Sequence, residues 1–185
     1  SAASVIAYYQ ALAASVPELP FFSYILNPHI DPVVVMRALQ QSVPNLIGAK
    51  YTGPNMYEMR QIMDLNDGKW VVFAGMDEQC VYGAMMGVDG AIGSTLNFMP
   101  GAYRAIQQAV ARGDMSAAQS MQLRANRVTA AMIEVGFNGA LREVLRLIGI
   151  ECGDPRLPGL PLSAEAKAAL RRNLEATDFA ELVAL

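Results

Sequence analysis

Residues 45–76, NLIGAKYTGPNMYEMRQIMDLNDGKWVVFAGM, carry the pattern that decides the fold. They contain a short apolar run (45–52), a helical pattern that stops at the turn residues Asn66, Asp67 and Gly68, and a second apolar run (69–76). Strands that are apolar throughout and alternate with helices are typical of a parallel sheet covered on both faces. The stretch therefore predicts a strand and a helix followed by the next strand.

The same rhythm occurs four times. Each predicted strand is followed by a helical pattern, and the predicted strands are 19–26, 45–52, 69–76 and 88–95. Asp31 and Pro32 suit the N-cap and first position of the first of these helical segments, and Gly113 suits the end of the last. Residues 1–17 have apolar positions at helical spacing and lack the basic flank of a secretory signal, so we expect an ordinary helix there.

The character of the chain changes after residue 113. Two long helical patterns follow, then a proline-containing irregular segment (150–162), then a final helix opened by Ser163 and Glu165. We therefore predict two domains, with 1–113 forming four parallel βα units and 114–185 forming a C-terminal helical extension.

Four βα units are half of what a closed barrel contains. A (β/α)8 barrel needs eight units and about 250 residues, whereas this chain has 185 residues. The predicted fold class is α/β, half of a (β/α)8 TIM barrel. Half a barrel exposes two long apolar edge strands, so we expect a missing barrel half, a second chain or a swapped copy to cover them.

Composition excludes several classes of function. The net charge is -3 and the pI about 5.1, with no extended basic cluster, so nucleic acid is not an expected partner. No apolar run reaches the roughly 18 to 20 residues of a membrane span. Cys80 and Cys152 lack metal-ligand spacing, so we expect buried free thiols in a reducing cytoplasm. The lone His29 argues against a histidine metal site or a Ser-His-Asp triad.

Active sites of βα barrels lie at the carboxyl ends of the strands. Lys50 follows Tyr24 by 26 residues and Gly75 follows Lys50 by 25. If each interval is one βα unit, the three residues lie at the same end of the barrel. Residues of interest near the four predicted strand ends are Tyr24, Lys50, Gly75, Asp77, Glu78, Ser94 and Thr95.

Each of these side chains has two interpretations. The stem of Lys50 can lie along the strand while its amine reaches solvent; alternatively, the apolar neighbours Leu46, Ile47 and Ala49 desolvate it, and a neutral amine is a nucleophile toward ketones. Tyr24 is either core or a proton donor and acceptor beside that amine. The carboxylates of Asp77 and Glu78 either stabilise a helix start or accept hydrogen bonds from a polyhydroxylated substrate.

The motifs "GAKYT", "AGMDEQ" and "GAIGSTLN", in this order and spacing, resemble the C-terminal half of the dihydrodipicolinate synthase/N-acetylneuraminate lyase family. The resemblance runs from "LPFFSYI" to about "GDPRLP", and the acidic pair with "GSTLN" favours the sialic acid lyase branch. It implies strands 5 to 8 of the barrel and a pyruvate-dependent Schiff-base aldolase. Family members are usually tetramers, so a homo-oligomer is expected by analogy.

The resemblance also implies roles. Lys50 would form the imine with the keto acid, Tyr24 would relay the proton during carbon–carbon cleavage, and Thr52 would bind substrate. The residues expected to hold the sugar's hydroxyl tail or its carboxylate are Gly75, Asp77, Glu78 and Ser94. No metal or organic cofactor is expected. The implied reaction is cleavage of N-acetylneuraminate to N-acetylmannosamine and pyruvate.

One part of the family pattern is missing. The family's first barrel half carries a Gly-Thr-Thr or Gly-Ser-Thr stretch that binds the substrate carboxylate, and no such stretch precedes Tyr24. The activity is therefore expected to be complete only with an N-terminal barrel half. Two alternatives stay open: a non-catalytic truncated paralogue that self-associates through its open sheet, and an aldolase for another 2-keto sugar acid.

Overall fold

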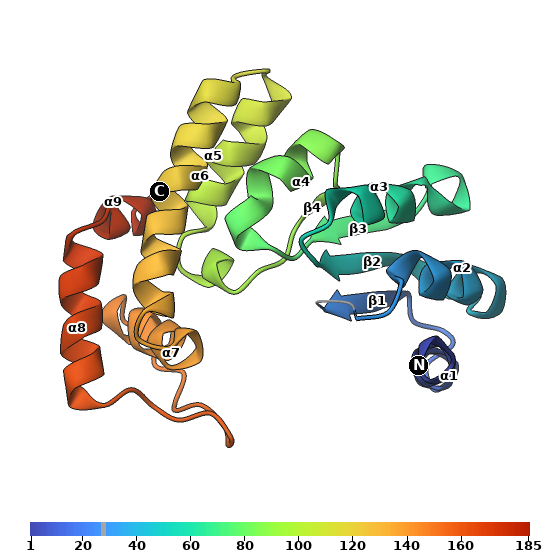
Figure 1. The fold of residues 1–185 in the computed structure, drawn as a ribbon, viewed down its shortest axis with the longest axis horizontal. Coiled ribbons are helices and arrows are strands. Elements are labelled where there is room, and N and C mark those ends of the chain that lie inside the picture. The colour runs from blue at the N-terminus through green and yellow to red at the C-terminus, as the bar shows by residue number, and fades with distance from the viewer. Residues whose placement is uncertain (27–28) are drawn as a thin grey trace. The chain divides into compact units, whose positions relative to one another are not determined.

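The computed structural model describes residues 1–26 and 29–185. The chain divides into two compact units, Ser1–Ile92 and Gly93–Leu185 (Figure 1). The first unit contains all the strands of the described part of the chain, and the second is built from helices. The boundary predicted at residue 113 concerns the end of the half barrel and stays a prediction.

The first unit is built on a parallel sheet with strand order β1-β2-β3-β4. The strands are β1 (Phe21–Leu26), β2 (Leu46–Thr52), β3 (Val71–Ala74) and β4 (Gly90–Ala91). All three pairings are parallel, which confirms the α/β class and the four parallel strands. The strand predicted at 88–95 is only two residues long, because its glycines offer no side chains to pack.

The helices of the first unit follow the predicted order. They are α1 (Ala2–Ala14), α2 (Pro32–Ser42), α3 (Met56–Asp64) and α4 (Cys80–Met86), with 3₁₀ helices η1 (Leu65–Gly68) and η2 (Asp77–Gln79). Asp31 caps α2 as predicted, accepting hydrogen bonds from the backbone of Val33 and Val34. The turn that ends η1 contains Asn66 and Asp67 in the left-handed region, followed by Gly68.

The two faces of the sheet differ in burial. Because strand residues alternate between faces, one face lies in the core beneath α2 and α3, and its buried residues include Ile25, Ala49, Tyr51, Val72 and Ala74. The opposite face, which we call the open face, is half-buried or exposed, and its residues include Phe22, Tyr24, Leu26, Lys50, Thr52 and Phe73. The described helices thus cover one face of the sheet, and the prediction of a sheet covered on both faces stays a prediction.

The second unit consists of packed helices. They are η3 (Thr95–Asn97), α5 (Pro100–Ala111), α6 (Met115–Ile133), α7 (Phe137–Leu147), α8 (Ala164–Glu175) and α9 (Phe179–Val183). Gly113 follows α5 with a φ of 76°, as its predicted place at the helix end requires. Ser163 caps α8 as predicted. The short helix α9 was not predicted.

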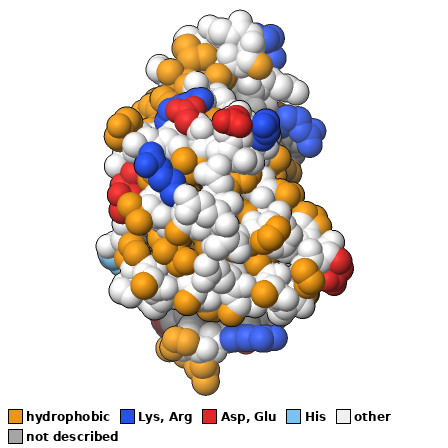
Figure 2. All heavy atoms as spheres, turned by 90° about the vertical axis from the view of Figure 1, so that its right-hand side faces the viewer, with side chains coloured by type: hydrophobic (Ala, Val, Ile, Leu, Met, Phe, Trp, Pro, Cys, Tyr) orange, Lys and Arg blue, Asp and Glu red, His pale blue; other side chains and the backbone are white. Residues whose placement is uncertain are grey.

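Exposed hydrophobic side chains are frequent. Figure 2 shows them over much of the face that it draws, with charged side chains standing in separate small groups. Large exposed hydrophobic side chains in the first unit include Tyr8, Leu12, Tyr24 and Leu26. In residues 1–26 and 29–185, no helix is long and apolar enough to span a membrane.

Candidate active site

Tyr24 and Lys50 face each other across β1 and β2. They are direct partners in the parallel register, so their side chains project from the same face of the sheet. The Lys50 Nζ lies over the Tyr24 ring, 4.2 Å from its centroid, which is the geometry of a cation–π contact. The structure thus brings together the two residues that the sequence predicts as catalytic.

The environment of Lys50 differs from the predicted one. Leu46 and Ala49 belong to the core on the helix-covered side of the sheet, and Ile47 is exposed. Lys50 itself is half-buried. Its direct partners on the neighbouring strands are aromatic, Tyr24 on one side and Phe73 on the other. Aromatic neighbours on the open face, rather than its neighbours in sequence, therefore surround the amine.

Thr52 and Gly75 fit closely against the same lysine. A Cβ on Gly75 would lie 1.8 Å from the Thr52 Oγ1 and 3.0 Å from the Lys50 Cε, so only glycine fits at this position. The Gly75 N–H donates to the Tyr51 carbonyl oxygen at 2.8 Å, which holds the backbone there. The Thr52 Oγ1 is buried and makes no hydrogen bond to the described part of the chain. Its capacity for a hydrogen bond is therefore unfilled, beside the stem of Lys50.

The acidic pair follows β3 directly. Asp77 is buried, with 6% of its surface exposed, and Glu78 is half-buried. Both lie in the first turn of η2, whose N-cap, Met76, provides no side-chain hydrogen bond. Parallel strands end at one edge of the sheet, so these carboxylates lie at the same edge as Gly75. Their predicted role toward substrate stays a prediction.

Ser94 belongs to the second unit. It is exposed and precedes η3, and its carbonyl oxygen accepts a hydrogen bond from the Asn97 side chain at 2.8 Å. The neighbouring Thr95 is buried and its Oγ1 hydrogen-bonds the Tyr103 hydroxyl at 2.6 Å, which gives it a structural place in this unit. The substrate-binding role of Ser94 stays a prediction.

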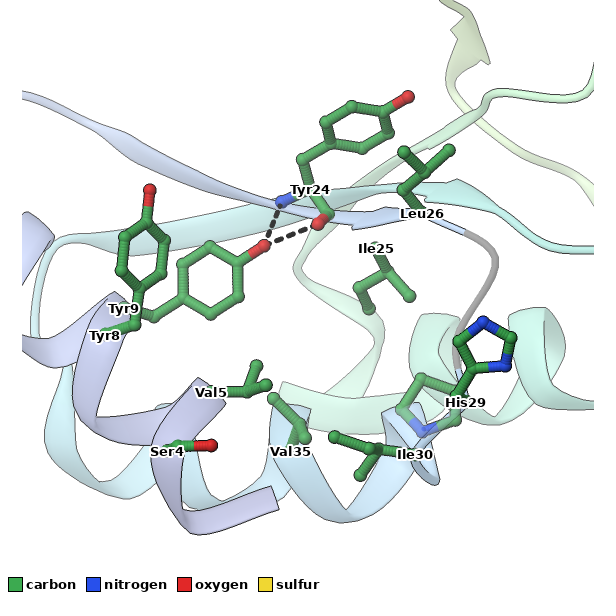
Figure 3. Close-up of a pocket in the computed structure, with 11 residues that line it drawn as sticks. Ser4, Val5, Tyr8, Tyr9, Tyr24, Ile25, Leu26, His29, Ile30 and Val35 are labelled. Carbon is green, nitrogen blue, oxygen red and sulfur yellow. Dashed lines mark hydrogen bonds between the residues drawn. The ribbon is translucent and has the colours of Figure 1, made fainter. Parts of the chain in front are cut away.

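Two features of the site were not predicted from sequence. The rings of Phe22 and Phe73 meet on the open face with centroids 5.6 Å apart. The Phe22 ring lies against Gly48, where an added Cβ would be 2.8 Å from it. A glycine inside a strand, two residues before Lys50, was the available signal. The second feature is Tyr9, whose hydroxyl hydrogen-bonds the backbone of Tyr24 (Figure 3).

The remaining candidates are the lone histidine and the two cysteines. His29 is exposed and lines a cavity with α1 and β1, where Figure 3 shows it on the far side from Tyr8 and Tyr9. Cys80 is buried as predicted, whereas Cys152 is half-buried, and neither forms a disulfide within the described residues. Within residues 1–26 and 29–185, no group of three or more His, Cys, Asp or Glu side chains could hold a metal ion.

Comparison with known proteins places this arrangement in a family. The model of the dihydrodipicolinate synthetase family matches residues 1–177. The chain belongs to that family. The resemblance drawn from "GAKYT", "AGMDEQ" and "GAIGSTLN" is therefore confirmed.

The matched relatives are longer than this chain. It is 33% identical over 168 residues to an N-acetylneuraminate lyase of Rhizobium meliloti (strain 1021), covering 90% of this chain and 56% of that protein. It is 29% identical to the N-acetylneuraminate lyase of Mus musculus, covering 95% of this chain and 57% of that protein. The chain thus spans little more than half the length of these curated relatives.

Solved structures agree with the sequence comparison. The structure of Proteus mirabilis N-acetylneuraminate lyase superposes with a TM-score of 0.89 at 28% identity, over 97% of this chain and 62% of that one. That of the Aliivibrio salmonicida lyase gives 0.88 at 27% identity, over 97% and 61%. Sequence and structure thus both support the membership of this chain in the family.

Proposed function

We propose that the chain forms strands 5 to 8 of a (β/α)8 barrel, with residues 1–113 in the barrel and 114–185 as its helical extension. Four parallel strands in sequential order, each followed by a helix, support this. So does the superposition of 97% of this chain on 62% of a solved lyase. The N-terminal barrel half, in the same or another polypeptide, is then its partner.

We further propose that the completed barrel is a class I aldolase that cleaves N-acetylneuraminate to N-acetylmannosamine and pyruvate. The observation that carries the proposal is the Lys50 amine, 4.2 Å from the centroid of the Tyr24 ring. Among the described residues of the open face, Lys50 can act as the nucleophile and Tyr24 can carry protons, and these two side chains are in direct contact. Names of similar proteins favour the sialic acid branch of the family.

The mechanism starts when the Lys50 ammonium gives a proton to solvent and the neutral amine attacks the keto carbon of the open-chain sugar acid. The hydroxyl of the adduct takes a proton from solvent and leaves as water, and the protonated imine so formed draws electrons from the carbon–carbon bond two atoms away. Tyr24 relays the proton of the sugar hydroxyl, accepting it as its own phenol proton passes to solvent, while that bond breaks and the aldehyde product departs. The enamine left on Lys50 takes a proton from solvent at its terminal carbon, and water then hydrolyses the protonated imine, which releases pyruvate, the Lys50 amine and one proton. The imine is the electron sink, so the reaction requires no metal or organic cofactor.

The other predicted residues would bind substrate. Thr52 brings a buried hydroxyl without a hydrogen-bond partner in the described residues next to the lysine stem, and Gly75 would contribute its backbone. Asp77 and Glu78 would accept hydrogen bonds from sugar hydroxyls, and Ser94 would bind the tail or the carboxylate. We propose a cytoplasmic homo-oligomer of complete barrels, in line with the family.

Reductive trapping tests the proposal. The chain is mixed with the part of the Rhizobium meliloti relative that lies outside the matched segment, then incubated with pyruvate and borohydride. We expect one reduced pyruvate adduct, which peptide mapping locates on Lys50. Lys50→Ala should abolish it and Lys69→Ala, at an exposed lysine paired with Asp67, should keep it. The absence of an adduct on Lys50 would contradict the enzyme proposal.

A substrate panel tests the finer assignment. Pyruvate release is measured from N-acetylneuraminate and from a 2-keto-3-deoxy sugar acid under the same conditions. Faster release from N-acetylneuraminate is expected, because the acidic pair Asp77 and Glu78 suits a long hydroxylated tail. Preference for the shorter acid would keep the aldolase mechanism and replace the substrate.

A further inference from the structure

Tyr51 lies between two residues that the proposed function assigns to the keto acid. In β2 it separates Lys50 from Thr52, and its side chain points to the opposite, helix-covered face of the sheet, where it is 1% exposed. The Thr52 Oγ1 makes no hydrogen bond to the described residues. The position of that hydroxyl therefore depends on the backbone on either side of it, at Tyr51 and Gly53.

The Tyr51 phenol holds the chain that follows Thr52. Its hydroxyl donates to the Glu58 carboxylate in the first turn of α3, at 2.7 Å. An added Cβ on Gly53 would lie 2.5 Å from the phenol oxygen, so the backbone at residue 53 passes directly against the phenol. The Asn55 side chain caps the same helix by accepting hydrogen bonds from two backbone N–H groups, at 3.1 Å and 3.3 Å. The turn from β2 into α3 is thus built around this phenol.

The backbone of Tyr51 holds the end of the next strand. Its carbonyl oxygen accepts a hydrogen bond from the Gly75 N–H at 2.8 Å. An added Cβ on Gly75 would lie 1.8 Å from the Thr52 Oγ1 and 3.0 Å from the Lys50 Cε, so these three residues fit closely together. A shift of the backbone at residue 51 would therefore move Gly75 and Thr52 relative to the lysine stem.

The hydrogen bond from Tyr51 to Glu58 is suited to this task. A phenol that donates to a carboxylate makes a stronger bond than two neutral groups do. Desolvation by burial, followed by the hydrogen bond to Glu58, raises the pKa of Tyr51 above its ordinary value, so the donor keeps its proton around neutral pH. A phenylalanine at this position would keep the ring and lose the bond.

We propose that Tyr51 is a positioning residue for the Schiff-base site, and that its bond to Glu58 fixes the Thr52 hydroxyl beside Lys50 where the keto acid binds. The inference rests on the proposed function, in which Lys50 forms the imine and Thr52 binds substrate. Tyr51 points to the other face of the sheet from the amine, so it acts through the backbone of β2 and of the turn after it. Loosening that turn should weaken binding of the keto acid and leave the amine itself able to react.

The test measures reductive trapping of pyruvate over a range of pyruvate concentrations, in the barrel completed with the Rhizobium meliloti segment. Tyr51→Phe should raise the half-saturating pyruvate concentration about tenfold, which corresponds to one lost hydrogen bond, and leave the trapping rate at saturation nearly unchanged. Glu58→Ala should do the same, and the double variant should do no more than either, because both remove one bond. Glu58→Gln keeps an acceptor and should stay near the wild-type value.

Arg60→Ala is the matched control. The Arg60 side chain, also on α3, pairs with Asp64 and donates to the Met86 carbonyl oxygen at 3.1 Å, so its loss loosens the same helix without removing a contact of Tyr51. It should leave the half-saturating concentration at the wild-type value. Amide hydrogen exchange of the chain by itself provides a second measurement. The Gly75 N–H should exchange faster in Tyr51→Phe and Glu58→Ala than in Arg60→Ala.

The outcomes separate this inference from the proposed function. Wild-type trapping with an unchanged half-saturating concentration in Tyr51→Phe would overturn the positioning role and leave the aldolase proposal standing. An equal rise in Arg60→Ala, unchanged Gly75 exchange in Tyr51→Phe, or a loss in Glu58→Gln as large as in Glu58→Ala would do the same. The absence of an adduct on Lys50 in the wild type would overturn the proposed function, and the positioning role with it.

Discussion

The amine of Lys50 lies over the ring of Tyr24, 4.2 Å from the ring centroid, and the two residues are direct partners in neighbouring parallel strands. A half-exposed contact of this kind contributes about 0.5–1 kcal/mol. Its larger consequence is positional, because the register of β1 and β2 fixes which phenol accompanies the amine. The ring holds the amine and the hydroxyl serves the proposed chemistry, and these two contributions can be separated by mutation.

Tyr24→Phe should separate them. It keeps the ring beneath Lys50 and removes the hydroxyl, so trapping with pyruvate should continue. Cleavage of the sugar acid by the completed barrel should fall by about 10²–10⁴-fold, the usual contribution of a general acid or base. Trapping is followed by mass spectrometry and cleavage by pyruvate release. Equal loss of both would show that the hydroxyl is needed for imine formation instead.

Gly75→Ala should destabilise the chain and block the site. Its new Cβ would meet the Thr52 Oγ1 at 1.8 Å, and overpacking of this kind costs about 1–3 kcal/mol. Thr52→Ala in the same chain removes that oxygen and should restore part of the free energy of unfolding, measured in urea. Additive losses in the double variant would contradict a direct clash.

Tyr51→Phe should flatten the alkaline limb of the stability profile. The Tyr51 hydroxyl donates to the Glu58 carboxylate at 2.7 Å, and desolvation, followed by that carboxylate, raises the pKa of Tyr51 above its ordinary 10.0. A raised phenol pKa means that the folded chain holds a proton that the unfolded chain has released. Stability is therefore fully present below pH 10 and decreases as the pH rises beyond it.

The comparison for this prediction is urea unfolding from neutral pH to above pH 10. At neutral pH, Tyr51→Phe should lose about 1–2 kcal/mol with the hydrogen bond. The wild-type advantage should then shrink as the pH rises above the ordinary tyrosine value. An advantage that stays constant over this range would refute the assigned cause.

Removing the charge of the buried Glu143 carboxylate should cost less stability than removing the cations that pair with it. It is 3% exposed on α7, and its carboxylate oxygens lie 3.2 Å from the Arg171 guanidinium and 3.4 Å from the Lys167 amine on α8. Both cations reach solvent, so Glu143→Gln leaves no buried charge. Lys167→Met with Arg171→Met leaves the carboxylate with Arg146 alone, at 3.7 Å. The double variant should lose more stability, up to about 3–5 kcal/mol.

The sequence was sufficient for the part of the fold that repeats. The 26-residue and 25-residue steps from Tyr24 through Lys50 to Gly75 correspond to one βα unit each, and the structure pairs Tyr24 with Lys50 directly. Asp31 and Ser163 cap the predicted helices, because capping depends on local chemistry.

What could not be predicted depends on contacts between distant residues. The Phe22 and Phe73 rings meet on the open face, where Phe22 pairs with Gly48 and no side chain at position 48 stands against the Phe22 ring. The bond from Tyr9 to the backbone of Tyr24 leaves no periodic signal in the sequence. The strand at 88–95 was overestimated because its apolar pattern contains glycines, which shorten β4 to Gly90–Ala91.

The close fit of Gly75 against Thr52 limits how this protein can change over evolution. A side chain at position 75 and the oxygen at position 52 would occupy the same space, so the first costs less once the second has gone. The two positions are therefore coupled, and related chains that carry a larger residue at the first should carry a smaller one at the second.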